Sequence, residues 1–395
     1  MIMYFDFRTY ARMFRLALRE ENPAGRRRLL FMLLVIVPIV ATVNTVCFFL
    51  DGVFFPGLRT IEVRTPVFIV GHARSGTTLM HRLMSADGER FSYFMLYEMF
   101  FPSLLQKKFI RFLAACDRRW LGARIEQRLK AWEDRKFAAT QDMHRTGLTA
   151  PEEDDFLYAF SCASGFWIVL LPYMGQLDFY YVDERPVSER RRLMRFYTDC
   201  VRRQLYLNGA NKIHLSKNPV FSGRVESLIE TFPDARLVVL MRNPYETIPS
   251  LLKLMQMSWN YRKWDEAQTN RSLRALAEQS FHTYRYPLEV LARHPEVKQA
   301  IVDYRELVAE PRRVVQQVYA QLGFPVSSAF DAVLQAEEQR ARAHETTHRY
   351  SLEEFGLKGD EIRTALADLF ERYGWDDDAT RPATSAAGGS HAGKR

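Results

Sequence analysis

The segment Val70–Leu79, V-G-H-A-R-S-G-T-T-L, constrains the fold of this chain more than any other. The apolar run Pro66–Gly71 predicts a buried β-strand, and the pattern from Thr77 onward predicts a helix that opens directly after it. Gly71 and Gly76 permit close approach of the backbone, and the first N–H groups of such a helix carry partial positive charge. The segment therefore predicts an anion site, and phosphate is the usual occupant of such sites.

Strands and helices alternate along the rest of the chain. Apolar runs predict further strands at Lys212–Ser216, Arg236–Met241 and Gln299–Leu307. Helical patterns begin near Ser222 and Tyr245, and residues between about 92 and 199 are mainly helical. This alternation predicts an α/β, three-layer fold, in which a central parallel sheet carries a helical insertion between its first two strands.

A second polar pair follows the predicted strand Arg236–Met241. The strand delivers Arg242 at its carboxyl end, where ligands bind in open α/β sheets. Ser250 lies two helical turns farther on and is able to converge with Arg242 on one phosphate. An arginine and a serine at this spacing form a weak pattern alone, but with the Gly71–Gly76 loop they predict a ligand with two phosphate positions.

An alternative interpretation is a nucleoside-triphosphate P-loop, GxxxxGK[ST], and hence a kinase or an ATPase. The glycine spacing of that motif is present, but Thr77 stands at the lysine position. The strand RLVVLM is followed by Arg242 and not by the aspartate that would hold a magnesium ion. The site is therefore poorly equipped to cleave a β–γ phosphate bond.

Together these motifs resemble the sulfotransferases that use 3′-phosphoadenosine 5′-phosphosulfate, over roughly Pro66–Trp375. PVFIVGHARSGTTL is similar to their 5′-phosphosulfate-binding loop, and LVVLMRNPYETIPS to their 3′-phosphate-binding strand and helix. SKNP, VDYRELVAEP and HRYSLEEFG continue the likeness. The similarity is closest to a branch with membrane-associated bacterial members and more distant to the tyrosylprotein sulfotransferases. It implies a P-loop-like fold, transfer of a sulfuryl group to a hydroxyl acceptor, and no metal.

The resemblance also implies roles for individual residues. Arg242 and Ser250 would bind the 3′-phosphate, and Lys217 in SKNP would neutralise charge on the leaving phosphate as a catalytic residue. The 5′-phosphosulfate would be bound by the loop residues Arg74, Ser75, Gly76, Thr77 and Thr78, of which Arg74 is also assigned to catalysis.

The general base is the least determined assignment. Glu98 in LYEMFFP matches the glutamate base of the tyrosylprotein branch, while His144 and His348 are alternatives because the cytosolic branch uses histidine. The acidic loop PEEDD, with Glu152 and Glu153, either edges the acceptor pocket or is simply solvated. In the tyrosylprotein branch the residue after the catalytic lysine is aspartate, whereas this chain has Asn218 after Lys217. The surroundings of Lys217 are therefore undetermined.

The amino-terminal region indicates attachment to a membrane. Seven arginines lie in residues 1–28, and the next 22 residues, Leu29–Leu50, carry no charge. At about 1.5 Å per residue such a helix is long enough to cross the roughly 30 Å hydrocarbon core. The run is uniformly apolar, which disfavours an amphipathic surface helix, and a helix of the soluble core is an alternative.

The topology of this segment is open. Arg26–Arg28 would hold the amino terminus in the cytoplasm and place the rest of the chain across an inner, or cytoplasmic, membrane. Pro38 and the renewed apolar run ending at Leu58 also allow the segment to bend back or to lie as a shallow anchor. The body would then stay on the side of residue 1.

Charge and composition narrow the partners. The net charge of +8 is compatible with nucleic acid, an anionic membrane or an anionic small molecule, but no nucleic-acid-binding motif is present. The acceptor would be a hydroxylated small molecule, a lipid or a glycan. A catalytically inactive nucleotide-binding membrane protein is a further alternative, since it would keep both phosphate sites.

These observations predict that the chain is divided into four parts. They are a basic cytoplasmic segment at 1–28, a membrane-associated segment at 29–58, a sulfotransferase domain at 59–375 and a disordered tail at 376–395.

Overall fold

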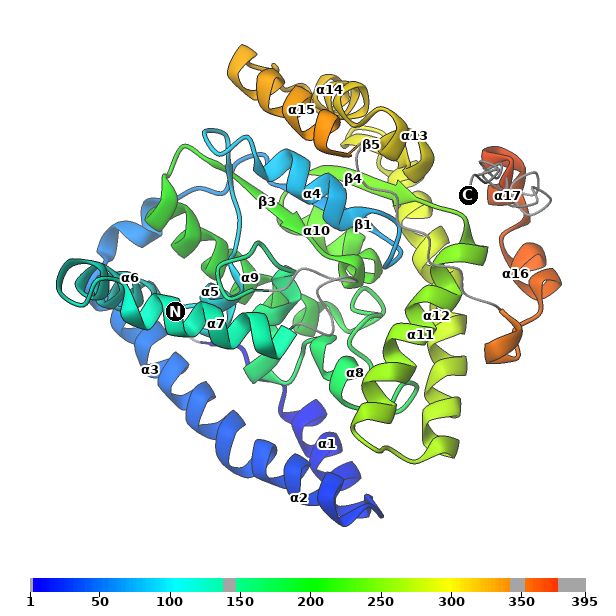
Figure 1. Ribbon diagram of the computed structural model, residues 1–395, viewed down its shortest axis with the longest axis horizontal. Coiled ribbons are helices and arrows are strands. Elements are labelled where there is room, and N and C mark those ends of the chain that lie inside the picture. The colour runs from blue at the N-terminus through cyan, green and yellow to red at the C-terminus, as the bar shows by residue number, and fades with distance from the viewer. Residues whose placement is uncertain (1–2, 138–146, 342–351, 376–395) are drawn as a thin grey trace, which may run out of the picture.

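A computed structural model describes residues 3–137, 147–341 and 352–375 of the chain. The predicted tail at 376–395 lies outside these residues. At the centre of the molecule is a parallel sheet of five strands in the order β2-β3-β1-β4-β5 (Figure 1). The strands are β1 (Val67–Gly71), β2 (Phe91–Ser92), β3 (Ile213–Lys217), β4 (Arg236–Met241) and β5 (Lys298–Asp303).

The helices surround this sheet. Those before β3 are α1 (Phe7–Arg19), α2 (Pro23–Phe31), the π-helical turn η1 (Met32–Ile36), α3 (Val37–Phe54), η2 (Pro56–Thr60), α4 (Thr77–Ser85), α5 (Leu96–Phe100), α6 (Leu104–Trp120), α7 (Arg124–Phe137), η3 (Asp154–Ser161), α8 (Phe166–Leu170) and α9 (Val187–Asn208). Those after it are η4 (Pro219–Arg224), α10 (Val225–Thr231), α11 (Pro244–Tyr261), α12 (Glu266–Arg293), α13 (Tyr304–Ala309), α14 (Pro311–Leu322), α15 (Ser328–Ala341), η5 (Glu353–Phe355), α16 (Gly359–Ala365) and α17 (Ala367–Tyr373).

Both faces of the sheet are covered, which explains why its strands read as continuous apolar runs. Side chains of β1 alternate between the two faces, as the strand geometry requires. Val67 and Ile69 pack into the core beneath α4, α14 and α15, and Phe68 and Val70 pack into the core formed with α9, α10, α11 and α12 (Figure 1). The predicted α/β fold with a central parallel sheet and a helical insertion is confirmed.

Two details of the sheet differ from the sequence prediction. The strand predicted at Gln299–Leu307 ends at Asp303, because the Asp303 carboxylate accepts a hydrogen bond from the backbone N–H of Arg305 at 2.8 Å and caps α13. The edge strand β2 was missed, since two residues are too short to give an alternating pattern.

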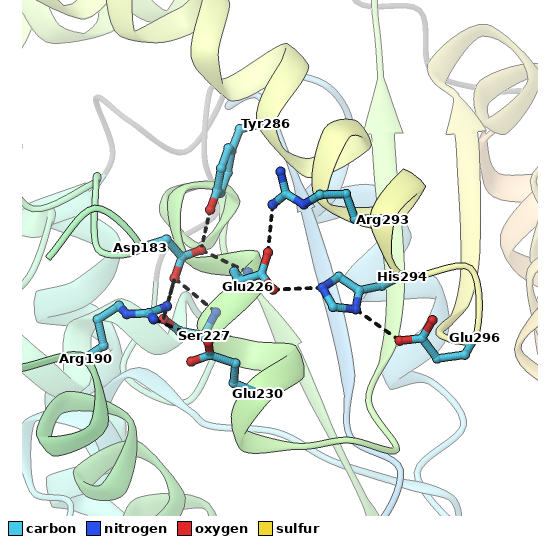
Figure 2. Close-up of polar contacts among 9 residues, drawn as sticks. All are labelled: Asp183, Arg190, Glu226, Ser227, Glu230, Tyr286, Arg293, His294 and Glu296. Carbon is cyan, nitrogen blue, oxygen red and sulfur yellow. Dashed lines mark hydrogen bonds and ion pairs between the residues drawn. The ribbon is translucent and has the colours of Figure 1, made fainter. Parts of the chain in front are cut away.

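A polar network joins α9, α10 and α12 on the face of the sheet that they cover (Figure 2). The Asp183 carboxylate accepts hydrogen bonds from the backbone of Ser227 at 3.0 Å and from the hydroxyl of Tyr286 at 3.1 Å. Arg293 pairs with Glu226 at 2.7 Å. These contacts fix the helix that follows β3 against the long helix α12, which also contacts the loop after β1.

Candidate active site

The loop between β1 and α4 has a backbone that requires glycine at both of its ends. Gly71 has φ 130°, and a Cβ there would lie 2.5 Å from the carbonyl oxygen of Leu240 on β4. Gly76 has φ 92°, and a Cβ there would lie 2.5 Å from Cδ2 of Tyr304. Such conformations and close approaches are available only to glycine, so the tight turn from strand into helix depends on both residues.

Side chains inside the loop fix it to its surroundings. The hydroxyl of Ser75 donates to the carbonyl of His72 at 2.6 Å. The His72 ring lies 2.9 Å from the Ser280 hydroxyl and stacks on Tyr284 of α12 with centroids 5.1 Å apart. Burial lowers the pKa of His72 to about 4, so the ring is uncharged near neutral pH. The first N–H groups of α4, beginning at Thr77, are thereby held at the carboxyl end of β1, where an anion can bind them.

Three residues that the sequence singled out converge beside this helix terminus. Arg74 has a left-handed backbone with φ 72°, and its Nε donates to Oγ of Ser250 at 3.2 Å. Nη1 of Arg242 donates to the carbonyl of Arg74 at 3.0 Å. The carboxyl ends of the neighbouring strands β1 and β4 thus bring together two guanidinium groups and one hydroxyl.

Arg242 also contacts Glu246 and Tyr304. Its Nε donates to the Glu246 carboxylate at 2.8 Å, one helical turn along α11, and its Cζ lies 4.1 Å from the centroid of the Tyr304 ring. The same ring packs against Gly76, so Tyr304 contacts both segments that were predicted to bind phosphate. Sequence analysis missed this residue, although it lies in the VDYREL motif. An anion bound by Arg242 has to compete with Glu246.

Lys217 lies at the same edge of the sheet. It is the last residue of β3, pairs with Ile69 of β1 in the strand register, and is 1% exposed. Its Nζ donates to Oε1 of Glu153 at 3.0 Å, although the two residues are 64 positions apart. A buried cation and a carboxylate therefore meet next to the loop after β1.

The acidic loop PEEDD is largely buried, so its interpretation as a solvated loop is wrong. Asp154 lies 2.8 Å from Nε2 of His214, and Asp155 forms an ion pair with Arg224 at 3.2 Å. These pairs hold the loop against β3 and η4. Glu153 keeps a side chain that is 28% exposed and faces Lys217.

The family of the chain follows from its sequence together with this site. Residues 66–328, which span the whole sheet, match the sequence model of the sulfotransferase family. The chain belongs to this family of sulfotransferases. Membership makes it a transferase and excludes the alternative of a kinase or an ATPase, in agreement with the absence of the P-loop lysine at Thr77.

Known sulfotransferases resemble the chain over most of its length. The curated relatives include the omega-hydroxy-beta-dihydromenaquinone-9 sulfotransferase Stf3 of Mycobacterium bovis and of Mycobacterium tuberculosis. Each is 23% identical over 353 residues, which cover 82% of this chain and 79% of the relative.

Two solved sulfotransferase structures share the fold. Sulfotransferase STF9 from Mycobacterium avium has a TM-score of 0.67 at 18% identity, covering 94% of this chain and 93% of its own. Sulfotransferase STF1 from Mycobacterium tuberculosis has a TM-score of 0.63 at 20% identity, covering 92% of this chain and 94% of its own.

Glu98, the residue assigned as base from the sulfotransferase motifs, is not brought to this cluster. Its carboxylate is fully buried and accepts hydrogen bonds from the backbone of Met95 at 3.0 Å, from Arg111 at 3.0 Å and from Gln204 at 2.7 Å. None of these partners belongs to the loop after β1, to β3 or to β4. The contacts are those of a residue that joins α5, α6 and α9.

His81 is a second residue that sequence analysis of this sulfotransferase missed. It lies on the buried side of α4, and burial followed by the nearby charge of Lys217 lowers its pKa to about 3. A neutral ring beside Lys217 adds no competing positive charge. The helical spacing from Thr77 was available in the sequence, but its position opposite Lys217 depends on the pairing of β1 with β3.

The two alternative bases, His144 and His348, lie outside the described residues. Within 3–137, 147–341 and 352–375, no group of three or more histidine, cysteine, aspartate or glutamate side chains is placed to hold a metal ion.

Proposed function

We propose that this sulfotransferase moves a sulfuryl group from 3′-phosphoadenosine 5′-phosphosulfate to the hydroxyl of a lipophilic acceptor at a membrane. The observation that carries the proposal is the convergence of Arg74, Ser250 and Arg242 at the amino terminus of α4, beside the Lys217–Glu153 pair.

The residues fit such a donor. Gly71 and Gly76 permit the tight turn that leaves the first N–H groups of α4 at the carboxyl end of β1, where the 5′-phosphosulfate would bind them. Arg74 and the hydroxyls of Thr77 and Thr78 would supply further donors, among which Thr78 is exposed, while Ser75 would contribute its position in the loop.

The 3′-phosphate would lie between Arg242 and Ser250. The hydrogen bond from Arg74 to Ser250 links this position to the first one, so both ends of the nucleotide would meet a preformed donor set. Tyr304 would hold the Arg242 guanidinium plane in place when Glu246 releases it.

The donor supplies a sulfuryl group whose S–O bond to the 5′-phosphate breaks as the acceptor oxygen bonds to sulfur. Glu153 would accept the proton of the acceptor hydroxyl, because it is the partly exposed carboxylate that contacts Lys217. Lys217 would stabilise the charge that develops on the departing phosphate oxygen, in a buried position where such stabilisation is strong. The two groups begin as an ion pair, and the donor and acceptor would separate them.

The lipophilic nature of the acceptor rests on the relatives. The name of Stf3 specifies a hydroxylated menaquinone as what that enzyme sulfates, and the long apolar helix near the amino terminus suits an enzyme that meets its acceptor at a membrane. Incubation of the enzyme with radiolabelled donor and a membrane lipid extract should give a labelled, organic-extractable product. Turnover of soluble sugars or phenols without any labelled lipid would contradict a lipophilic acceptor.

The donor is tested by calorimetric titration with 3′-phosphoadenosine 5′-phosphate and with ATP. We expect the first to bind at least tenfold more tightly, because ATP has no 3′-phosphate for Arg242 and Ser250, and one such charge-assisted contact contributes about 1.5–3 kcal/mol. Preference for ATP would contradict the proposal.

The base is tested by comparing Glu153→Gln with Glu98→Gln. Loss of a general base lowers kcat by about 10²–10⁴-fold, and we expect this for Glu153→Gln with little change in nucleotide affinity. Glu98→Gln should instead lower the thermal midpoint, because it weakens the contacts to Arg111 and Gln204. A stable Glu98→Gln enzyme without turnover, beside an active Glu153→Gln enzyme, would restore Glu98 as the base.

A further inference from the structure

The helix that the sequence marks as membrane-associated is continuous from Pro23 to Phe54, through α2, η1 and α3. By length and composition it could cross a membrane. The π-helical turn Met32–Ile36 precedes Pro38, and it lets the helix continue past a residue that has no N–H to donate. In Figure 1 the blue helix α3 forms the lower left border of the molecule, and α1 lies beside its continuation α2.

One side of this helix is built into the body. Its buried residues recur every three or four positions and are Leu29, Leu33, Val37, Ala41, Asn44, Phe48 and Asp51. The Asp51 carboxylate accepts hydrogen bonds from the backbone N–H groups of Leu104 and Leu105, both at 2.8 Å, and so caps α6. It also pairs with Arg203 of α9 at 2.7 Å, with both side chains fully buried. These polar contacts fix the carboxyl end of the helix to the insertion.

The segment before the helix is fixed to the same body. The backbone N–H of Asp6 donates to the carbonyl of Ser161 at 2.9 Å, and the Tyr173 hydroxyl donates to Glu20 at 2.6 Å. The Asn22 side chain donates to the carbonyl of Lys263 at 2.9 Å. A spanning helix would separate its two ends by about 30 Å of hydrocarbon. Contacts from both ends to one body are incompatible with a span.

The other side of the helix is apolar and exposed. Its exposed large hydrophobic residues are Phe31, Leu34, Ile39, Val43, Val46, Phe49, Val53 and Phe54. At about 1.5 Å per residue this strip is roughly 35 Å long. We call these eight side chains the outer strip. An apolar surface of this size on a protein marks a site of contact with an apolar partner.

Positive charge lies at both ends of the outer strip. Arg26, Arg27 and Arg28 are exposed one turn before Phe31 on the same helix. At the far end, Nζ of Lys108 lies 5.2 Å from the ring of Phe55. An apolar strip with cationic ends is complementary to a lipid leaflet that has anionic headgroups above acyl chains. A second copy of the chain packed along the strip would place positive charge against positive charge at both ends, in either orientation.

We infer that the outer strip lies in the plane of an anionic membrane leaflet, so that the enzyme is bound to one face of the bilayer and does not span it. The arginine-rich segment and the catalytic body then lie on the same side of the bilayer, and the arginines favour the anionic cytoplasmic leaflet. The inference deepens the proposed membrane association and removes the difficulty of a catalytic domain separated from a cytoplasmic nucleotide donor.

Flotation of the purified full chain with vesicles tests whether the outer strip binds lipid. Vesicles of phosphatidylcholine with phosphatidylglycerol should carry the wild-type chain. The double variant Val46→Asp with Phe49→Asp should partition into the vesicles at least about tenfold less. In this variant, charges replace two apolar side chains that would lie in the lipid. Val333→Asp, which adds one charge at an exposed apolar site on α15, is the matched control and should float as the wild type does.

Two results would contradict the inference that the outer strip binds lipid. Wild-type chain that stays unbound to anionic vesicles would remove both the inference and the proposed membrane association. A wild-type dimer in solution that the double variant converts to monomer, without a difference in vesicle binding, would make the outer strip a surface between copies. Because Val46 and Phe49 are exposed, an unchanged melting temperature of the double variant verifies that it is folded.

Cysteine labelling tests the topology separately. Leu18→Cys and Val333→Cys are placed singly in a chain whose half-buried Cys47 and Cys116 are replaced by serine. In right-side-out and inverted membrane vesicles, an impermeant maleimide should reach both positions from the cytoplasmic face. Labelling of Leu18→Cys from one face and of Val333→Cys from the other would overturn the in-plane arrangement while leaving membrane association intact.

Discussion

Two regions of this enzyme collect positive charge, and they differ in how the charge is held. At the carboxyl edge of the sheet, Arg74 bonds to Ser250, and Arg242 lies between Glu246 and the ring of Tyr304. In α1 and α2 the arginines are exposed on the helix surface. Oriented groups recognise one small anion of fixed shape, whereas exposed charges suit a surface whose headgroups move. The same residue type would therefore serve the two partners proposed for this enzyme.

The comparison predicts that substitutions in the amino-terminal helix mainly lower stability, whereas substitutions in the site mainly lower activity. Asp51→Asn should have the largest effect on stability. It removes one partner of a buried ion pair and leaves Arg203 without its counter-charge, at a cost of about 3–5 kcal/mol in the free energy of unfolding. Urea unfolding measures the change. Arg195→Ala, an exposed position on the same helix α9, should change stability by less than about 0.5 kcal/mol. Equal stability of Asp51→Asn and wild type would mean that the helix is not anchored through this pair.

Arg74→Ala and Arg242→Ala should act in the opposite way. Each removes a charge-assisted contact of about 1.5–3 kcal/mol, so the affinity for 3′-phosphoadenosine 5′-phosphate should fall roughly 10- to 150-fold. The melting temperature without ligand should change little, because both side chains are only partly buried. Titration calorimetry with Arg293→Ala as an exposed control decides this. Unchanged affinity in both variants would remove the two phosphate positions.

The region of the site should also make stability sensitive to acid. His72 and His81 have folded pKa values lowered by burial to about 4 and about 3, while an unfolded histidine titrates near 6.5. Below pH 6.5 the unfolded chain therefore binds more protons than the folded protein. As the pH falls from roughly 6.5 to 5, each histidine lowers the free energy of unfolding by about 1.4 kcal/mol per pH unit. His81→Gln should reduce the slope of unfolding free energy against pH by one proton in that window. A slope that the substitution leaves unchanged would show that His81 is already charged in the folded protein.

The smallest effects are expected for the surface arginines. Changing Arg26, Arg27 or Arg28 to glutamine singly should weaken binding to anionic vesicles by about 1 kcal/mol, which is roughly fivefold. The loss should shrink in high salt, because exposed charges are screened. Nucleotide affinity should stay at the wild-type value. If these variants instead weakened nucleotide binding, the separation between the two regions would fail.

The elements around the proposed donor site could be predicted from the sequence because they are local. Gly71 and Gly76 lie within one turn, and the helix terminus follows directly, so strand, loop and helix can be predicted from a short window. The position of Arg242 followed from the rule that ligands bind at the carboxyl ends of parallel strands, and that of Lys217 from the resemblance to known sulfotransferases. The neighbours of these residues did not follow. Tyr304 and Glu153 reach the site through strand order and a buried acidic loop, which no local pattern records.

The assignment of Glu98 as the base stays a prediction, and its surroundings could not be read from the sequence. Its distance along the chain from the Gly71–Gly76 loop matched a family motif, but distance along the chain does not fix the direction of a side chain. The folded insertion turns it toward Arg111 and Gln204. A glutamate on a short helix has the same local pattern whether it serves as a cap or as a base.

The sequence by itself determined a strand, turn and helix with two glycines, a parallel sheet and a long apolar helix beside a run of arginines. Only the tertiary structure decided which side of that helix faces protein. All residues of Leu29–Leu50 are uncharged, so hydropathy is nearly uniform around the helix and carries no direction. The side that faces the protein is set by contacts between residues far apart in the chain, above all the ion pair of Asp51 with Arg203. A buried charge is stable only where an opposite charge lies beside it.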